Sequence, residues 1–168
     1  ILAEQLGFHF ALSMAKWRGY RGPSHHSDVT LERFTTIAGL AEAASRIGVW
    51  GTVHTMVFHP AVVAKMTAVL DQISKGRFGL NIVSGSNPTD QGQMGLWMDL
   101  DHAERYELAA EWLTVLKRLW TEDRVDHQGK HYQLTDCMSN PKPVSPPPII
   151  CAGASDRGFL FTMEHCTG

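Results

Sequence analysis

The chain has few of the features that mark membrane, disulfide-rich or secreted proteins. Among its 168 residues no apolar run approaches the roughly 20 needed to cross a bilayer. Residues 1–6 lack the basic region of a secretory leader. Three cysteines, Cys137, Cys151 and Cys166, are too few and too scattered for a disulfide framework. We therefore expect reduced thiols, no membrane partner and a cytoplasmic location.

The sequence also lacks an excess of either charge sign. Fifteen Lys and Arg face seventeen Asp and Glu, a formal net charge of −2, and no dense basic run offers a surface to nucleic acid. One loop contains three potential metal ligands, His25, His26 and Asp28. Because neighbouring residues of one loop rarely have the geometry to bind a metal ion together, we expect no metal site. The first residue is Ile, and the opening reads as the tail of a helix already begun, so we expect residues before it.

What is present is an alternation of short apolar runs and longer segments with helical spacing. The strand-like runs are residues 8–13, 47–52, 78–83 and 149–152. The helix-like segments are residues 31–44, 60–73, 101–120 and 155–165. Such alternation indicates βαβ units in a parallel sheet, with helices outside it.

Two parallel architectures compete, an open doubly wound sheet and a (β/α)8 barrel. No strand is followed by Gly-x-Gly-x-x-Gly and no Walker A pattern occurs, which weakens the open-sheet alternative. Polar and Gly-rich residues collect after the strands, where barrels keep their chemistry. A closed barrel needs eight strands and roughly 250 residues. We therefore predict a single-domain fragment over residues 1–168, about strands 2 to 5 of a TIM barrel.

Two loop regions complete this prediction. Residues 84–100 form a long connection without recognisable periodicity. Residues 125–134 read as a small hairpin insertion around a Gln128-Gly129-Lys130 turn. His127 and His131 flank that turn, and we expect both to be solvated.

Three positions carry candidate chemistry, each with an ordinary structural alternative. Asn81 lies inside an apolar strand, so its amide is either paired within the core or bonded to the rim of a planar heterocycle. Arg105 and Tyr106 lie near a helix start, which suits a phosphate but also a surface salt bridge over a core aromatic. Ser155 follows a strand and a glycine turn, either as an anion site or as a simple helix cap.

Five segments in register resemble the luciferase-like monooxygenases that include alkanesulfonate, dimethylsulfone and pyrimidine oxygenases. They are residues 70–78, 81–85 (Asn-Ile-Val-Ser-Gly), 101–106 (Asp-His-Ala-Glu-Arg-Tyr), 125–132 and 152–156 (Ala-Gly-Ala-Ser-Asp). The resemblance implies reduced FMN at the carboxyl-end mouth of the barrel, delivered by a separate NAD(P)H-dependent flavin reductase. It also implies that Asn81 contacts the flavin ring, while Arg105, Tyr106 and Ser155 hold its phosphate.

Other carried-over positions divide between branches of the family. Residues 10–16 resemble the pyrimidine-oxygenase branch, in which the residues at Ala15 and Lys16 meet the flavin. Asp90 stands where that branch has a Glu near the cofactor. The loop at residues 86–88, Ser-Asn-Pro, instead resembles the sulfonate branch. The implied substrate is therefore a small organosulfur compound or a nitrogen heterocycle.

The implied reaction uses reduced FMN and O2 to place one oxygen atom on the substrate, with the cofactor supplying the difficult chemistry. Thr52, His54 and Thr55 are expected after the second strand, facing the flavin. His54 and Thr55 are the candidate catalytic residues, with His54 donating or relaying a proton, or else simply bonding to backbone. The alternatives are a deazaflavin (F420) oxidoreductase on the same barrel and a non-catalytic flavin-binding or assembly partner. A half barrel leaves open strand edges, so we also expect a homo-oligomer.

Overall fold

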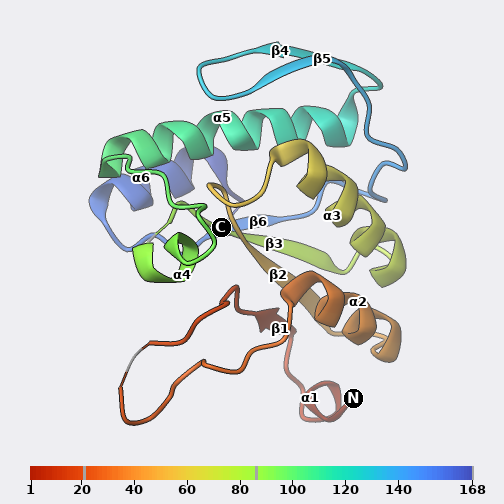
Figure 1. The fold of residues 1–168 in the computed structure, drawn as a ribbon. Coiled ribbons are helices and arrows are strands. Elements are labelled where there is room, and N and C mark those ends of the chain that lie inside the picture. The colour runs from red at the N-terminus through yellow and green to blue at the C-terminus, as the bar shows by residue number, and fades with distance from the viewer. Residues whose placement is uncertain (21, 86, 168) are drawn as a thin grey trace.

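A four-stranded parallel sheet forms the centre of the molecule (Figure 1). The computed structural model describes residues 1–20, 22–85 and 87–167. The sheet order is β1-β2-β3-β6, and all three pairings are parallel. Its strands are β1 (Phe10–Ser13), β2 (Gly48–His54), β3 (Phe78–Val83) and β6 (Ile149–Cys151). The predicted strand order and direction are confirmed.

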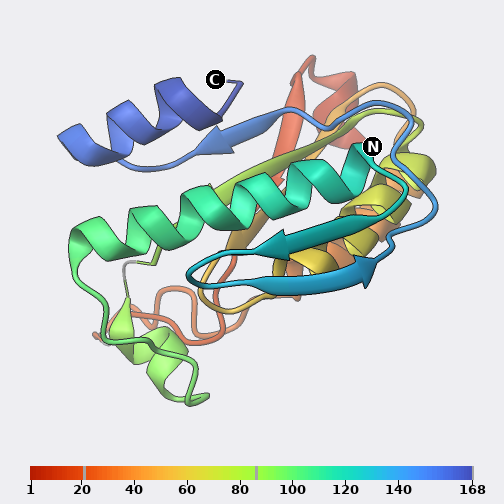
Figure 2. The same ribbon diagram turned by 90° about the horizontal axis from the view of Figure 1, so that it is seen from above.

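The helices follow the strands in the same spatial order. Helix α2 packs against α3, α3 against α5, and α5 against α6, so they form a row beside the sheet (Figure 2). The helices are α1 (Leu2–Gln5), α2 (Arg33–Ala43), α3 (Pro60–Ser74), α4 (Pro88–Gly92), α5 (His102–Thr121) and α6 (Asp156–His165). This is the layered arrangement of successive βα units. Among the described residues β1 and β6 each have one neighbouring strand, so the sheet is open.

Local sequence signals explain where the long helices begin. Pro60 occupies the first turn of α3, where its missing N–H costs nothing, and the preceding His59 side chain accepts a bond from Ala61 N. At α5, Asp101 accepts from Glu104 N and the Glu104 carboxylate accepts from Asp101 N. The two bonds together form a reciprocal capping box.

The two faces of the sheet differ in character. Every second residue along the strands points toward the helices, and the apolar residues at these positions are fully buried, among them Val49, Leu80 and Ile149. On the opposite side, the positions near the carboxyl ends of the strands carry polar groups, including Thr52 and Asn81, which pair in register. Because side chains alternate along a strand, this one pattern builds both the core and the floor of a site.

The structure corrects several predicted boundaries. Strand β1 begins at Phe10 rather than residue 8, and β2 runs on to His54, so Thr52 and His54 lie in the strand and not after it. Helix α2 begins at Arg33, two residues after Leu31. The connection over residues 84–100 contains α4, which was not predicted.

The hairpin insertion consists of β4 (Val125–Gln128) and β5 (Gln133–Cys137), an antiparallel pair lying over α5 (Figure 1). It reaches past the predicted end at residue 134. None of the described helices is both long and apolar enough to cross a membrane.

Candidate active site

A cavity of about 640 Å³ opens at the carboxyl ends of the four parallel strands. Its wall is formed by residues of β2 and β3, by the segments that follow β1, β3 and β6, and by the first turns of α5. This is the end at which parallel α/β proteins bind ligands. Seven of the nine residues predicted to bind the cofactor or to act in catalysis line the cavity: Ala15, Lys16, His54, Asn81, Arg105, Tyr106 and Ser155. Thr52, which was expected to face the flavin, lines it too.

Asn81 contributes an unpaired acceptor to this cavity. Its Nδ2 donates to Thr52 Oγ1 at 3.0 Å, while its Oδ1 is buried without a hydrogen-bond partner among the described residues. The side chain is only 6% exposed. A buried amide oxygen without a donor costs free energy that a bound N–H group can recover. Its chemistry therefore fits a heterocycle with a ring N–H, as a flavin has.

His54 lies beside it with a defined proton arrangement. Its Nε2 lies 3.1 Å from the Ala15 carbonyl oxygen, which can only accept, so Nε2 carries the proton. Burial lowers the pKa of His54, and the positive charges of Arg33 and Lys16 act in the same direction. The neutral ring thus presents the Nδ1 lone pair, which is buried and unpartnered among the described residues. His54 therefore has an unpaired acceptor atom in the wall of the cavity, and the proton-transfer role expected from the sequence stays a prediction.

A second cluster lies at the N-terminus of α6. Ser155 caps this helix by accepting from Gly158 N at 3.1 Å, and its hydroxyl lies 3.3 Å from His102 Nε2. The Tyr106 hydroxyl reaches the same turn, because a Cβ on Gly153 or Gly158 would come within 2.6 or 2.5 Å of it. The two predicted phosphate-binding hydroxyls therefore approach one glycine turn beside a helix N-terminus. That environment suits an anion.

His102 also lines the cavity, although it was not among the residues predicted from the sequence. It lies one turn before Tyr106 on α5, and the two rings meet edge to face with centroids 5.2 Å apart. The i, i+4 spacing places both side chains on one face of the helix, which is the signal that would have identified it. Arg105, next to them, donates from Nη1 to the Leu100 carbonyl at 3.1 Å.

Two predicted site residues lie outside the cavity wall. Thr55 is buried with its hydroxyl unpartnered among the described residues. Asp90 is also buried, and its Oδ1 accepts from Trp17 N and Arg18 N. Ser86, which belonged to the sulfonate-like loop, lies outside the described residues.

The loop histidines do not converge on a shared point. His25 Nδ1 lies 3.0 Å from Asp28 Oδ2, whereas His26 stacks on the Tyr20 ring. Over residues 1–20, 22–85 and 87–167, no three His, Cys, Asp or Glu side chains are grouped closely enough to hold a metal.

The family model for luciferase-like monooxygenases matches residues 2–168. The chain belongs to this family. It is 44% identical over 164 residues to the pyrimidine monooxygenase RutA of Acinetobacter baylyi, covering 97% of this chain and 44% of that protein. The chain thus spans a little under half the length of the curated relatives it matches.

Solved structures show how widely this fold is used. The EDTA monooxygenase EmoA of Chelativorans sp. BNC1 superposes with a TM-score of 0.89 at 22% identity, over 98% of this chain and 43% of that one. An F420-dependent secondary alcohol dehydrogenase superposes with a TM-score of 0.78 at 21% identity, over 93% and 47%. At these identities the likeness establishes the fold alone.

Proposed function

We propose that this chain forms the flavin-binding part of a two-component monooxygenase that uses reduced FMN and O2 to oxygenate a small nitrogen heterocycle or organosulfur compound. The similarity to pyrimidine monooxygenases favours the heterocycle. A separate NAD(P)H-dependent flavin reductase supplies the reduced FMN, and we place the system in the cytoplasm. One observation carries the proposal: a single cavity joins an unpaired amide oxygen at Asn81 to an anion-suited helix start at Ser155.

The residues at the two ends of the cavity fit the two ends of the cofactor. Asn81 would hold the isoalloxazine ring through its free Oδ1. Ser155 and Tyr106, with Arg105 and His102 beside them, would hold the phosphate. A cation and several hydroxyl or imidazole donors around a helix N-terminus provide charge-assisted bonds to a dianion.

When bound, the reduced flavin supplies the reaction with O2 and the transfer of one oxygen atom to the substrate. The protein contributes position, water exclusion and proton placement. Leu12, Met14 and Val83 make part of the cavity wall apolar, which limits water beside the ring. His54, neutral and proton-bearing at Nε2, offers Nδ1 to an N–H of the ring or substrate.

Oxygen transfer tests this proposal directly. The full-length protein is mixed with FMN, a flavin reductase, NADH and 18O2, and a panel of pyrimidines and alkanesulfonates is screened by mass spectrometry. Incorporation of one labelled oxygen into a pyrimidine is the expected result. The same screen is repeated with reduced F420 in place of FMN and the reductase. Hydride transfer with F420, and no incorporation of oxygen with either cofactor, would establish the deazaflavin alternative. Tight FMN binding without turnover of any substrate would establish a non-catalytic flavin-binding role.

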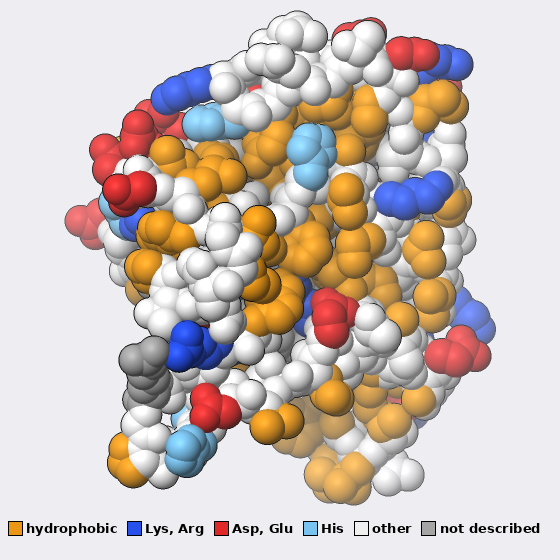
Figure 3. Space-filling model, viewed as in Figure 1, with side chains coloured by type: hydrophobic (Ala, Val, Ile, Leu, Met, Phe, Trp, Pro, Cys, Tyr) orange, Lys and Arg blue, Asp and Glu red, His pale blue; other side chains and the backbone are white. Residues whose placement is uncertain are grey.

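We also propose that further strands of the same barrel cover the open faces of this half. Phe10 and Leu12 on edge strand β1 are 52% and 44% exposed, and α6 exposes Phe159, Leu160 and Met163. Figure 3 shows further hydrophobic side chains at the lower end of one face, where α1 lies. Apolar surface and open strand edges of this kind are normally covered.

Sedimentation distinguishes the possible partners of these faces. Residues 1–168 expressed alone should associate or aggregate, whereas the longer protein should be well behaved, as a barrel or as a homo-oligomer of barrels. A monodisperse, stable monomer of residues 1–168 would contradict this proposal.

A further inference from the structure

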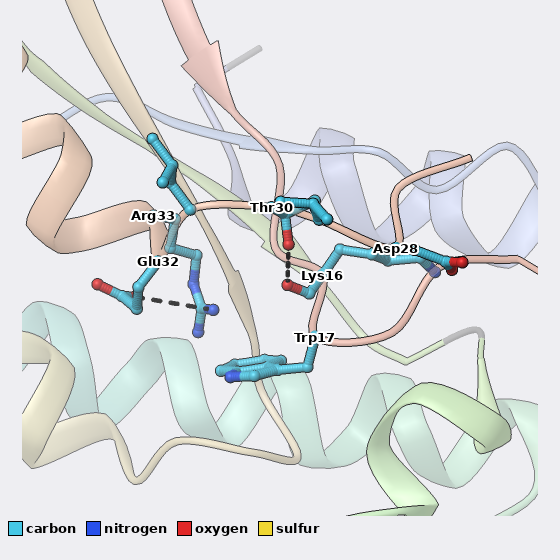
Figure 4. A pocket seen from close by; sticks show the side chains of 8 residues that line it. Lys16, Trp17, Asp28, Thr30, Glu32 and Arg33 are labelled. Atoms are coloured by element: carbon cyan, nitrogen blue, oxygen red, sulfur yellow. Dashed lines mark hydrogen bonds and ion pairs between the residues drawn. The ribbon is translucent and has the colours of Figure 1, made fainter. Parts of the chain in front are cut away.

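Residues 14–18, which follow β1, form part of the cavity wall and are held by side chains from distant parts of the chain. Ala15 and Lys16 line the cavity. The Ala15 carbonyl accepts from His54 Nε2 at 3.1 Å. The Lys16 carbonyl accepts from Thr30 Oγ1 at 2.8 Å (Figure 4). This part of the wall is therefore fixed through its main chain.

Asp90 provides the strongest of these main-chain contacts. Its Oδ1 accepts from Trp17 N at 3.0 Å and from Arg18 N at 2.6 Å. The side chain is buried on α4 and lies outside the cavity wall. Hydrogen bonds to an ionised carboxylate are stronger than neutral ones, so this contact dominates the anchoring of the segment. The resemblance to pyrimidine oxygenases implies direct contact of this position with the cofactor, whereas the structure directs it to the loop.

Arg33 contacts the same segment through the side-chain ring of Trp17. Its guanidinium carbon lies 4.5 Å from the centre of the Trp17 ring and 4.7 Å from that of Phe58. Trp17 and Phe58 are themselves stacked, with centroids 6.1 Å apart and planes 24° from parallel. Figure 4 shows the Arg33 and Trp17 side chains extending toward each other from α2 and from the loop.

The surroundings of Arg33 indicate that these rings are its main contacts. It is 2% exposed, and its Nε and Nη2 have no hydrogen-bond partner among the described residues. Its nearest carboxylate oxygen, on Glu32, is 4.0 Å from Nη1. Burial lowers the pKa of Arg33 to about 10, against the opposing charges of Glu32 and Asp90, so it stays protonated at neutral pH. A desolvated cation on aromatic faces is a strong cation–π arrangement.

We propose that Asp90 and Arg33 are positioning residues for the cofactor cavity. They hold Trp17 by its main chain and by its ring, and so fix Ala15 and Lys16 in the cavity wall. The effect on flavin binding rests on the function proposed above, whereas the effect on the segment does not. The two effects are therefore measured separately.

Limited trypsin digestion of the native full-length protein reports on the segment without any cofactor. Trypsin cleaves after Lys16 and Arg18, next to the amides that Asp90 holds. In Asp90→Ala, cleavage at these two sites should accelerate at least tenfold, with cleavage after Lys130 unchanged as an internal reference. Asp90→Asn retains an acceptor oxygen and should accelerate cleavage less. Asp99→Ala, a change of an exposed aspartate in the following loop, should behave as wild type.

Arg33 is tested by two substitutions that separate charge from volume. Arg33→Lys keeps the cation and should accelerate cleavage only a few fold. Arg33→Met fills the space without charge and should approach the rate of Asp90→Ala. A rate for Arg33→Met equal to that of wild type would show that Arg33 only fills space, and would overturn its part of the proposal.

FMN titration then reports on the cavity. Asp90→Ala should weaken flavin binding about tenfold, with turnover at saturating flavin changed less than twofold, because the segment positions and does not react. Unchanged cleavage in Asp90→Ala overturns the positioning role, and faster cleavage with unchanged flavin affinity overturns its link to the cavity. If the wild-type protein binds no FMN, the proposed function fails, and the cleavage rates alone decide whether the segment is held.

Discussion

Two polar sites in this molecule differ in whether their hydrogen-bonding groups are paired. Under the β4–β5 hairpin, the Glu111 carboxylate on α5 accepts from His127 Nε2, His131 N and Tyr132 N at 2.9 to 3.2 Å. In the cavity wall, Asn81 Oδ1 and His54 Nδ1 are more deeply buried and have no partner among the described residues. Buried polar groups are nearly always paired. Asn81 and His54 line the cavity, so a ligand bound there can pair these two atoms, whereas His131 Nε2 near the hairpin is also unpaired among the described residues but lies outside this cavity.

The hairpin site should therefore control stability and leave the cavity alone. Glu111→Ala removes several hydrogen bonds to an ionised group and leaves two main-chain donors unpaired, which should lower the free energy of unfolding by about 3 kcal/mol. Glu107→Ala, one turn away, should cost less than about 0.5 kcal/mol, because the partner of Glu107 among the described residues is the exposed Lys130. Urea denaturation of the full-length variants measures both. A loss of FMN affinity in Glu111→Ala at temperatures where it stays folded would break the division between the two sites.

The cavity should show the reverse pattern at its phosphate end. Tyr106→Phe with Ser155→Ala removes two hydroxyls near the α6 N-terminus and should weaken FMN binding about tenfold or more, roughly 1.4 kcal/mol. Turnover at saturating flavin should fall less, because the phosphate is remote from the reacting ring. Isothermal titration with FMN and with riboflavin sharpens the test, since riboflavin has no phosphate and its affinity should change little. Unchanged FMN affinity would remove these residues from the site.

Asn81 tests the claim that its free oxygen serves a ligand and not the fold. Asn81→Leu replaces a half-paired buried amide by an apolar side chain of similar size, so the free energy of unfolding should change by less than about 1 kcal/mol. Flavin affinity should nevertheless fall by severalfold. Thermal unfolding with and without FMN measures both effects. A large loss of stability in the absence of flavin would assign Asn81 a structural role instead.

The sequence predicted those features of the fold and the site that depend on residues close together in the chain. The alternation of apolar runs and helical stripes predicted the parallel strand order, because each βα unit is encoded within about 30 residues. Asn81 was identifiable because an amide in an apolar strand requires a partner. Helix α4 was missed because five residues are too few to show a helical period.

Long-range pairing accounts for the other failures. The two amides that Asp90 holds lie 73 and 72 residues earlier in the chain, and no local pattern encodes such a contact. His127 and His131 were both expected to be solvated, and this was wrong. His127 donates to Glu111 sixteen residues away, and the Nε2 atom of His131 is buried. Within the site, the sequence named the residues that line the cavity better than the residues that hold its wall.

The smallest expected effect concerns the protonation of His54. Burial lowers its pKa in the folded protein relative to the unfolded chain, so the folded state binds fewer protons at mildly acidic pH. Stability from this residue is therefore complete above the unfolded value of about 6.5 and is lost as the pH falls toward the lower folded value. His54→Gln removes this titration while leaving the other histidines in place, so the free energies of unfolding of wild type and His54→Gln should converge between pH 7.5 and pH 5.5.

The affinity for FMN should depend on pH in the same direction. A bound flavin that donates to Nδ1 of His54 holds the ring neutral, so FMN binding should weaken as His54 takes up a proton. If wild type and His54→Gln show the same pH dependence of stability and of flavin affinity, His54 is not a buried neutral acceptor, and the cavity loses one of the two unpaired groups proposed to bind the ligand.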